Sequence, residues 1–223
     1  MRSGGRTLGY VFIALSLLTV VGVYRWVISP IVTEKYILAL LSEEPSDSPT
    51  LVPKVFKAFM PRRQVLTSIS LPIPGRAGEE VAYGTVAVNR AGIFIISRIC
   101  GSGVIENPPR GEKWRFVSGG NIKEFPNPFK AQESPRRLLS AYSATVGARD
   151  VPVHTLLVYT DPALKFSAPP PKGIMHISDA YRRMRRISAK GKLDRKTVRR
   201  VISALRDAND GLINYDSCEL IKR

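Results

Sequence analysis

The feature that most constrains this chain is an uncharged, mostly apolar run close to its start. Thr7 to Tyr24 reads TLGYVFIALSLLTVVGVY and contains no Asp, Glu, Lys or Arg. As a helix, a run of this length crosses the hydrocarbon core of a bilayer. The sequence therefore predicts an N-terminal membrane anchor over residues 1–33. The remainder of the 223 residues is enough for one domain with a packed core.

A cleaved signal peptide is the alternative explanation of this segment, because Arg2 and Arg6 precede the apolar run. The segment ends Gly22-Val23-Tyr24-Arg25-Trp26, which lacks the small residues of a cleavage site. A retained anchor is therefore favoured. Basic residues flank both ends of the run, with the larger number following it, so we expect a single-pass protein whose C-terminal domain is cytoplasmic.

The overall charge indicates which partners a soluble part would attract. Lys and Arg number 34 against 18 Asp and Glu, a formal net charge of +16. Such a surface favours polyanions, either nucleic acid or anionic lipid headgroups, although a basic surface that is merely solvated is also consistent with it. The chain has two cysteines, Cys100 and Cys218, and two histidines, His154 and His176, all far apart in the sequence. We therefore expect no metal site and no cofactor, and two free thiols rather than a Cys100–Cys218 disulfide.

Hydrophobic patterning predicts the order of the elements after the anchor. Residues 34–59 are expected to form a short juxtamembrane helix followed by a Ser/Pro-rich linker, because 42–53 reads SEEPSDSPTLVP. Alternating or continuous apolar runs predict strands over 65–71, 81–89, 93–99, 113–118 and 153–160. Residues 93–99 are almost entirely apolar, which is typical of a central strand covered on both faces.

Capping residues mark the expected helices. Asn127 followed by Pro128 predicts a helix over 127–146, in which Pro135 marks either a kink or the true start. Ser178 and Asp194 are the expected caps of two basic helices, which form a helical pair over 176–209 before a tail, 210–223. These elements together predict an α/β domain over 60–175, with the helical pair following it.

An ordered set of short motifs accompanies this pattern. Gly92-Ile93-Phe94-Ile95-Ile96 comes first, Gly101-Ser102-Gly103-Val104-Ile105 follows, then Trp114, and then Asn127-Pro128-Phe129-Lys130-Ala131-Gln132. In this order they resemble the nuclease-related (NERD) domain family, over roughly residues 60 to 207. The resemblance implies a restriction-endonuclease-like core, which is a mixed sheet flanked by helices.

The positions that the resemblance assigns to catalysis hold the wrong residue types. The family's aspartate falls at or near Gly84, its glutamate at Ser97 and its lysine at Ile99, whereas Gln132 is retained. In such nucleases two carboxylates hold a divalent metal that activates water, and the lysine offsets charge in the transition state. Residues 84–99 contain no Asp, Glu or Lys. The domain is therefore expected to be inactive as a nuclease.

Relocated carboxylates would be the alternative, and four glutamates flank the expected strands: Glu79, Glu80, Glu106 and Glu112. Solvated loop charges explain these four more simply.

The two terminal helices carry a dense set of cations with few acids among them. On the second helix these cations lie off the apolar stripe, so they face solvent, nucleic acid phosphates or lipid headgroups. The residues expected to make such contacts are Arg182, Arg183, Arg185, Arg186, Arg195, Lys196, Arg199 and Arg200.

These observations favour a membrane-anchored, catalytically inactive nuclease-related domain that binds nucleic acid or a protein partner. One alternative is a purely structural subunit of a membrane protein complex. The other is a divergent metal-dependent nuclease that uses relocated carboxylates.

Overall fold

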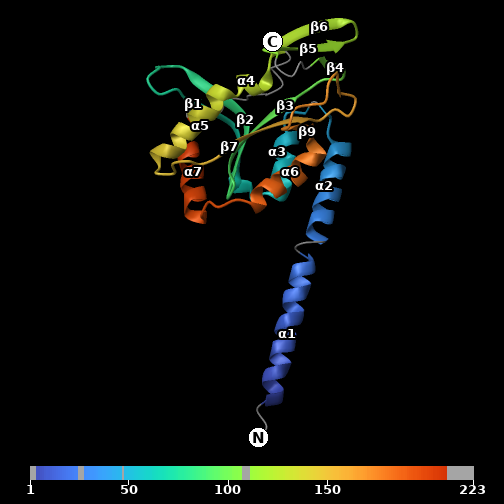
Figure 1. Cartoon of the computed structure of the whole chain (residues 1–223), viewed down its shortest axis with the longest axis vertical. Helices are drawn as coiled ribbons and strands as arrows, with labels where there is room; N and C mark the ends of the chain where they lie inside the picture. The colour runs from blue at the N-terminus through green and yellow to red at the C-terminus, as the bar shows by residue number, and fades with distance from the viewer. Residues whose placement is uncertain (1–3, 25–27, 47, 107–110, 210–223) are drawn as a thin grey trace.

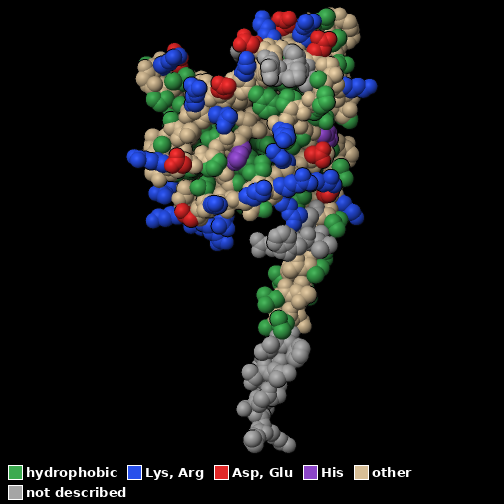
Figure 2. Space-filling view, in the orientation of Figure 1, with side chains coloured by type: hydrophobic (Ala, Val, Ile, Leu, Met, Phe, Trp, Pro, Cys, Tyr) green, Lys and Arg blue, Asp and Glu red, His purple; other side chains and the backbone are tan. Residues whose placement is uncertain are grey.

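A computed structural model describes residues 4–24, 28–46, 48–106 and 111–209. For residues 4–12, 29 and 30 it describes the backbone alone. Helix α1 (Gly4–Val23) extends away from the body of the molecule, and α2 (Ser29–Glu43) joins it to that body (Figure 1). Hydrophobic side chains along the described part of α1, among them Leu17 and Leu18, are exposed (Figure 2).

The membrane anchor expected over residues 1–33 includes positions outside the described residues, namely 1–3, 25–27 and the side chains of 4–12, 29 and 30. Within the part of the chain that was described, no helix combines the length and apolar composition needed to cross a membrane.

The segment expected to be a linker belongs to the folded body. Helix α3 (Leu51–Phe59) buries Leu51, Val52, Val55 and Phe56 against one face of the main sheet. Pro53 is the third residue of this helix, a position whose backbone N–H needs no helical partner.

The chain just before α3 is also held. Arg98 donates from Nη1 to the Ser48 carbonyl, and the Thr160 hydroxyl donates to the Ser46 carbonyl. A short 3₁₀ helix (Arg62–Gln64) then leads from α3 into the first strand.

The main sheet has five strands in the order β1-β2-β3-β7-β9. Strands β1 and β2 pair antiparallel, as do β2 and β3, whereas β3, β7 and β9 run parallel. Every residue of β3 is buried, as its apolar sequence predicts. The strands are β1 (Val65–Pro72), β2 (Glu80–Asn89), β3 (Gly92–Ile99), β7 (Val153–Tyr159) and β9 (Ile174–His176).

A second sheet of four short strands follows the order β6-β5-β4-β8. Trp114 and Ile105 are fully buried between this sheet and Leu157 of β7. Trp114 is therefore a core residue. The strands are β4 (Val104–Glu106), β5 (Lys113–Ser118), β6 (Asn121–Pro126) and β8 (Lys165–Phe166).

Helices cover both faces of the main sheet (Figure 1). Helix α3 and helix α6 (Ile177–Ala189) pack on one face, where Phe56 and Met184 share a core cluster with Phe94. Helix α5 (Glu133–Thr145) and helix α7 (Arg195–Asp207) pack on the other face. The predicted mixed α/β architecture with flanking helices is therefore confirmed.

The helix expected over 127–146 is two helices. Asn127 caps α4 (Pro128–Ala131) by accepting from the Phe129 N–H, and α5 begins anew at Glu133. Pro135 then sits in the first turn of α5, where it does not interrupt the hydrogen-bond ladder.

Of the two predicted N-caps of the basic helices, one is wrong and one is confirmed. The N-cap of α6 is His176 rather than Ser178, and its side chain accepts from the Ser178 N–H. Asp194 caps α7, as predicted, by accepting from the Thr197 N–H at 2.8 Å.

The expectation of free thiols is wrong for Cys100, which is disulfide-bonded. Cys218, the other cysteine of the chain, lies outside the described residues. Disulfides persist in oxidising compartments, whereas the flanking charges predict a cytoplasmic domain, and the location stays a prediction.

Candidate functional site at the separation of two strands

The main sheet opens where β2 leaves β3. Their antiparallel ladder runs from the pair Asn89–Gly92 to the pair Thr85–Ile96 and ends there. Continuing this register would set Gly84 opposite Ser97. The β1–β2 ladder is interrupted at the same level, where Ser68 has a left-handed φ of 51°. The outer half of β2 therefore turns away from β3 at Gly84.

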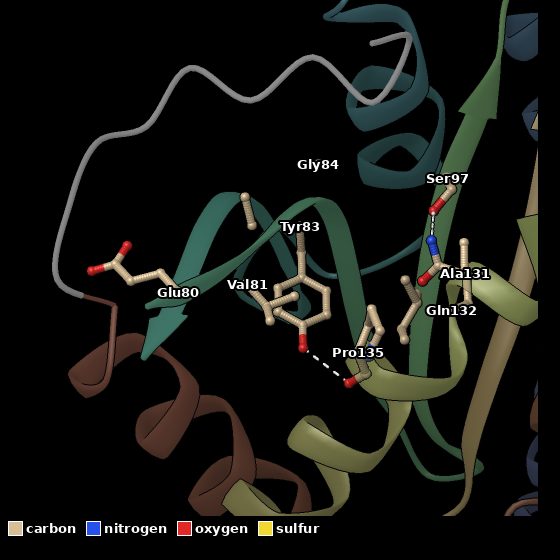
Figure 3. A pocket seen from close by; sticks show the side chains of 10 residues that line it. Glu80, Val81, Tyr83, Gly84, Ser97, Ala131, Gln132 and Pro135 are labelled. Carbon is tan, nitrogen blue, oxygen red and sulfur yellow. Dashed lines mark hydrogen bonds between the residues drawn. The ribbon is translucent and has the colours of Figure 1, made fainter. Parts of the chain in front are cut away.

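The space between the separating strands is a cavity of about 340 Å³, closed on one side by the start of α5 (Figure 3). The structure brings Gly84, Ser97 and Gln132 together at this cavity, although they come from two strands and a helix junction. The lining residues are Glu80, Val81, Ala82, Tyr83, Gly84, Ile95, Ser97, Ala131, Gln132 and Pro135.

Ile99, the fourth position that the family resemblance singled out, is not among the lining residues. Its side chain is buried with Ile105 and Trp114 in the core beneath the second sheet. An apolar side chain at this position extends the core, and the residues that line the cavity include no Lys or Arg.

A neutral polar pair forms one wall of the cavity. The Gln132 side-chain amide donates from Nε2 to the Ser97 hydroxyl at 3.0 Å, and both side chains are buried. Gln132 Oε1 is buried without a hydrogen-bond partner among the described residues. A buried acceptor without a partner costs about 1–3 kcal/mol, so this atom favours any donor that enters the cavity.

Tyr83 closes the opposite wall, and its hydroxyl donates to the Pro135 carbonyl at 2.9 Å (Figure 3). Burial raises the pKa of Tyr83 well above its ordinary value, and the nearby Tyr142 raises it further. The phenol therefore stays protonated at neutral pH. It positions the first turn of α5 and is not available as a general base.

The four glutamates considered as relocated metal ligands lie apart and have other partners. Glu79 pairs with Arg76 at 3.0 Å, Glu106 with Arg115 at 3.5 Å, and Glu112 with Lys130 at 3.3 Å. Only Glu80 reaches the cavity, where it accepts from the Ser70 hydroxyl. Across the described ranges, no three His, Cys, Asp or Glu side chains gather into a group that would hold a metal ion.

The cations expected to form one binding surface are divided between the two faces of the sheet. Helix α6 lies beside α3, whereas α7 lies beside α5 (Figure 1). Arg182 is held by Glu34 of α2 and by Asp179. Arg185 also has a partner.

On α7 the cations are exposed, and Arg200 donates to the Thr197 hydroxyl at 3.2 Å. Arg183 and Arg186 instead line a second cavity, together with Arg90 from the β2–β3 turn. No local signal in the sequence identifies Arg90 as a member of such a site, because it lies about one hundred residues away along the chain.

Comparison of the chain with protein-family models, with curated proteins and with solved structures gives no match.

Proposed function

We propose that this chain is a membrane-tethered, nuclease-related domain that binds nucleic acid without cleaving it. The observation that carries the proposal is the cavity at the separation of β2 and β3, which has neutral side chains where a nuclease needs charged ones. Gly84, Ser97 and Gln132 line it together. These are three of the four positions that the family resemblance assigns to the active centre.

The chemistry of the cavity supports inactivity. Hard divalent cations such as Mg²⁺ are held by carboxylates, and metal-assisted phosphodiester hydrolysis requires the metal to activate a water molecule. The cavity offers one carboxylate, Glu80, which accepts from Ser70. The hydroxyl of Ser97 is occupied by Gln132. One rim carboxylate and a neutral pair do not neutralise a divalent ion.

Binding is assigned to the exposed side of α7. Its apolar stripe, which includes Val201 and Leu205, is buried against the sheet, so Arg195, Lys196 and Arg199 face outward. A row of exposed cations on one helix face is typical of a phosphate-binding surface. The formal net charge of +16 adds a long-range attraction for polyanions.

The tether is assigned to α1. Most of its described side chains are apolar and exposed, for example Ile13 and Val20, and no other described element covers them. A membrane or a partner helix would remove this apolar surface from water. Which side of the membrane holds the domain remains a prediction, with the flanking charges and the Cys100 disulfide favouring opposite sides.

The test uses the full chain in a neutral detergent, with labelled duplex DNA and RNA, magnesium or manganese, and two salt concentrations. We expect binding that weakens steeply with salt, and intact nucleic acid with or without chelator. The variant Arg195→Glu/Lys196→Glu should weaken binding by roughly tenfold or more. The matched variant Arg183→Glu/Arg186→Glu makes the same charge change on α6, and should weaken it less.

Three outcomes decide the proposal. Cleavage that a chelator abolishes would overturn the inactive assignment, and Glu80→Gln would then identify the metal ligand. The absence of both binding and cleavage would also overturn it, and would leave a structural role in a membrane complex. Salt-sensitive binding without cleavage supports it.

A further inference from the structure

A second cavity lies where the β2–β3 turn meets the end of α6 and the loop to α7. Its volume is about 640 Å³, within the range of roughly 300–1,000 Å³ that is usual for small-molecule sites. Here it is called the basic groove. It is lined by Arg90, Ala91, Asp150, Pro152, His154, Arg183, Arg186, Ile187, Lys190, Gly191, Lys192 and Leu193.

The charge of the basic groove is unbalanced. Five of its lining side chains are cations, namely Arg90, Arg183, Arg186, Lys190 and Lys192, and one is an acid, Asp150. In the described part of the chain, no Asp or Glu forms an ion pair with any of these five. Arg182 of the same helix is different, because Glu34 and Asp179 both pair with it. The groove therefore holds positive charge that no Asp or Glu of the described residues pairs with.

The walls of the basic groove are joined by hydrogen bonds and by one close approach of the two backbones. The Leu193 N–H donates to the Arg90 carbonyl at 2.9 Å, and Arg90 Nε donates back to the Leu193 carbonyl at 3.1 Å. A Cβ on Gly191 would lie 2.5 Å from the Ala91 nitrogen, so glycine is needed for this close approach. The Asn89 side-chain amide also donates to the Ser188 hydroxyl at 2.7 Å. These contacts fix the backbone segments from which the cations extend, so less of the site has to be ordered when a ligand binds.

We propose that the basic groove binds a compact ligand that carries two or more phosphate groups, either free in solution or as the headgroup of a membrane lipid. Arg side chains bind phosphate through two parallel N–H donors, and Lys side chains add compact positive charge. Five cations around one concave space suit a ligand with several negative charges close together. One phosphate group would leave most of this charge unneutralised.

The location of the basic groove separates it from the proposed nucleic-acid surface. Its cations come from α6 and the two turns, whereas the exposed cations of α7 are not among its lining residues. Lys and Arg side chains gather along the edge of the body from which α2 and α1 extend (Figure 2). A lipid headgroup is therefore one of the two sources of the phosphate groups to be tested. The proposal does not depend on nucleic-acid binding.

The first arm of the test is calorimetric titration of the full chain, in a neutral detergent, with inorganic triphosphate. We expect saturable binding that Arg183→Glu/Arg186→Glu weakens by about tenfold or more, because charge-assisted hydrogen bonds are lost. The matched control Arg195→Glu/Lys196→Glu makes the same charge change outside the groove and should bind as the unaltered chain does.

Asp150→Asn provides a variant with the opposite expected effect. Asp150 has a left-handed φ of 61°, which asparagine tolerates well, so the backbone should not change. Removal of the one acid in the groove should tighten triphosphate binding. A gain of affinity cannot result from misfolding, so this variant keeps the test decisive even if the double charge reversal fails to fold.

The second arm distinguishes the two sources of phosphate. Nanodiscs of phosphatidylcholine, with and without phosphatidylinositol bisphosphate, are added to the triphosphate complex. Displacement by the phosphoinositide discs alone supports a headgroup ligand, and no displacement by either supports a free ligand.

The proposal is overturned if triphosphate and headgroup both fail to bind. It is also overturned if both double variants lose binding equally, because binding would then reflect net charge alone. Loss of DNA binding in Arg183→Glu/Arg186→Glu, with no triphosphate binding in any variant, would assign the groove to nucleic acid instead.

Discussion

Ser97 accepts a hydrogen bond from the Gln132 side-chain amide at 3.0 Å, and this contact joins the central strand β3 to the junction of α4 and α5. Both side chains are buried, and the other end of the amide has no partner among the described residues. The pair therefore holds the cavity wall in place while leaving one acceptor for a ligand or water.

Ser97→Ala should destabilise the protein because it leaves the Gln132 amide without its acceptor. An unsatisfied buried group costs about 1–3 kcal/mol, and this loss should appear in the free energy of unfolding measured with urea. The double variant Ser97→Ala/Gln132→Leu removes both partners and should recover part of the loss. Ser203→Ala, at an exposed position of α7, serves as the control. Additive losses in the double variant would contradict the pairing.

Gly92→Ala should be strongly destabilising. Gly92 has φ +130°, and an added Cβ would lie 2.1 Å from the Pro152 carbonyl oxygen, which accepts from the Ile93 N–H. The start of β3 would have to move away from β7. Gly75→Ala is the matched comparison, since it has φ +79° with open space around the added Cβ. Gly75→Ala should cost only the backbone strain of about 1–2 kcal/mol. In thermal unfolding, the midpoint temperature of Gly92→Ala should therefore lie well below that of Gly75→Ala.

Stability should depend on pH through Asp194. The Thr197 backbone N–H, followed by the Thr197 hydroxyl, lowers the pKa of Asp194 below its ordinary value of 3.8. A lowered pKa in the folded state means that this carboxylate stabilises the fold above its ordinary pKa. The contribution is lost as the pH falls through the folded-state value.

Asp194→Asn isolates this effect, because asparagine caps a helix without titrating. The urea midpoint of the unaltered chain should exceed that of Asp194→Asn at neutral pH, and the difference should shrink below about pH 4. A difference independent of pH would contradict the assignment. Asp194→Ala should be less stable than Asp194→Asn throughout.

Cys100 should resist alkylation in the unreduced protein. Its sulfur is in a disulfide, so iodoacetamide should label the Cys100 peptide only after reduction, as read by mass spectrometry. Alkylation during cell lysis also reports the compartment. Full labelling of Cys100 without reduction would show that this thiol is free. It would then support both the free thiol and the cytoplasmic location that the sequence predicts.

The sequence predicted those elements whose residues determine them locally. Continuous apolar residues identified β3 as the buried central strand, and Asn127 and Asp194 marked two helix starts correctly. Helix α3 was missed, because serines and prolines around Pro53 are typical of a linker. Only burial of Phe56 and its neighbours against the sheet explains why this segment is helical.

The site was predictable only in part. Family resemblance placed Gly84 and Ser97 in one centre, and the end of the β2–β3 ladder just before this pair explains why both line one cavity. The same resemblance gave no reason for Ile99 to belong to the core instead. The basic groove depends on Arg90 contacting the loop that contains Leu193, and a contact between residues so far apart in the chain has no local signal.

The buried Arg98 ties the segment between α2 and α3 to the main sheet. It is the penultimate residue of β3 and donates to the Ser48 carbonyl between α2 and α3, and Arg182 of α6 holds α2 at Glu34. The chain from Glu34 to Ser48 is therefore attached to the body at both of its ends, so a pull on α2 would load α6 as well as β3. Ser97 precedes Arg98 in the strand and its side chain points to the other face, so β3 separates this attachment from the Ser97–Gln132 contact.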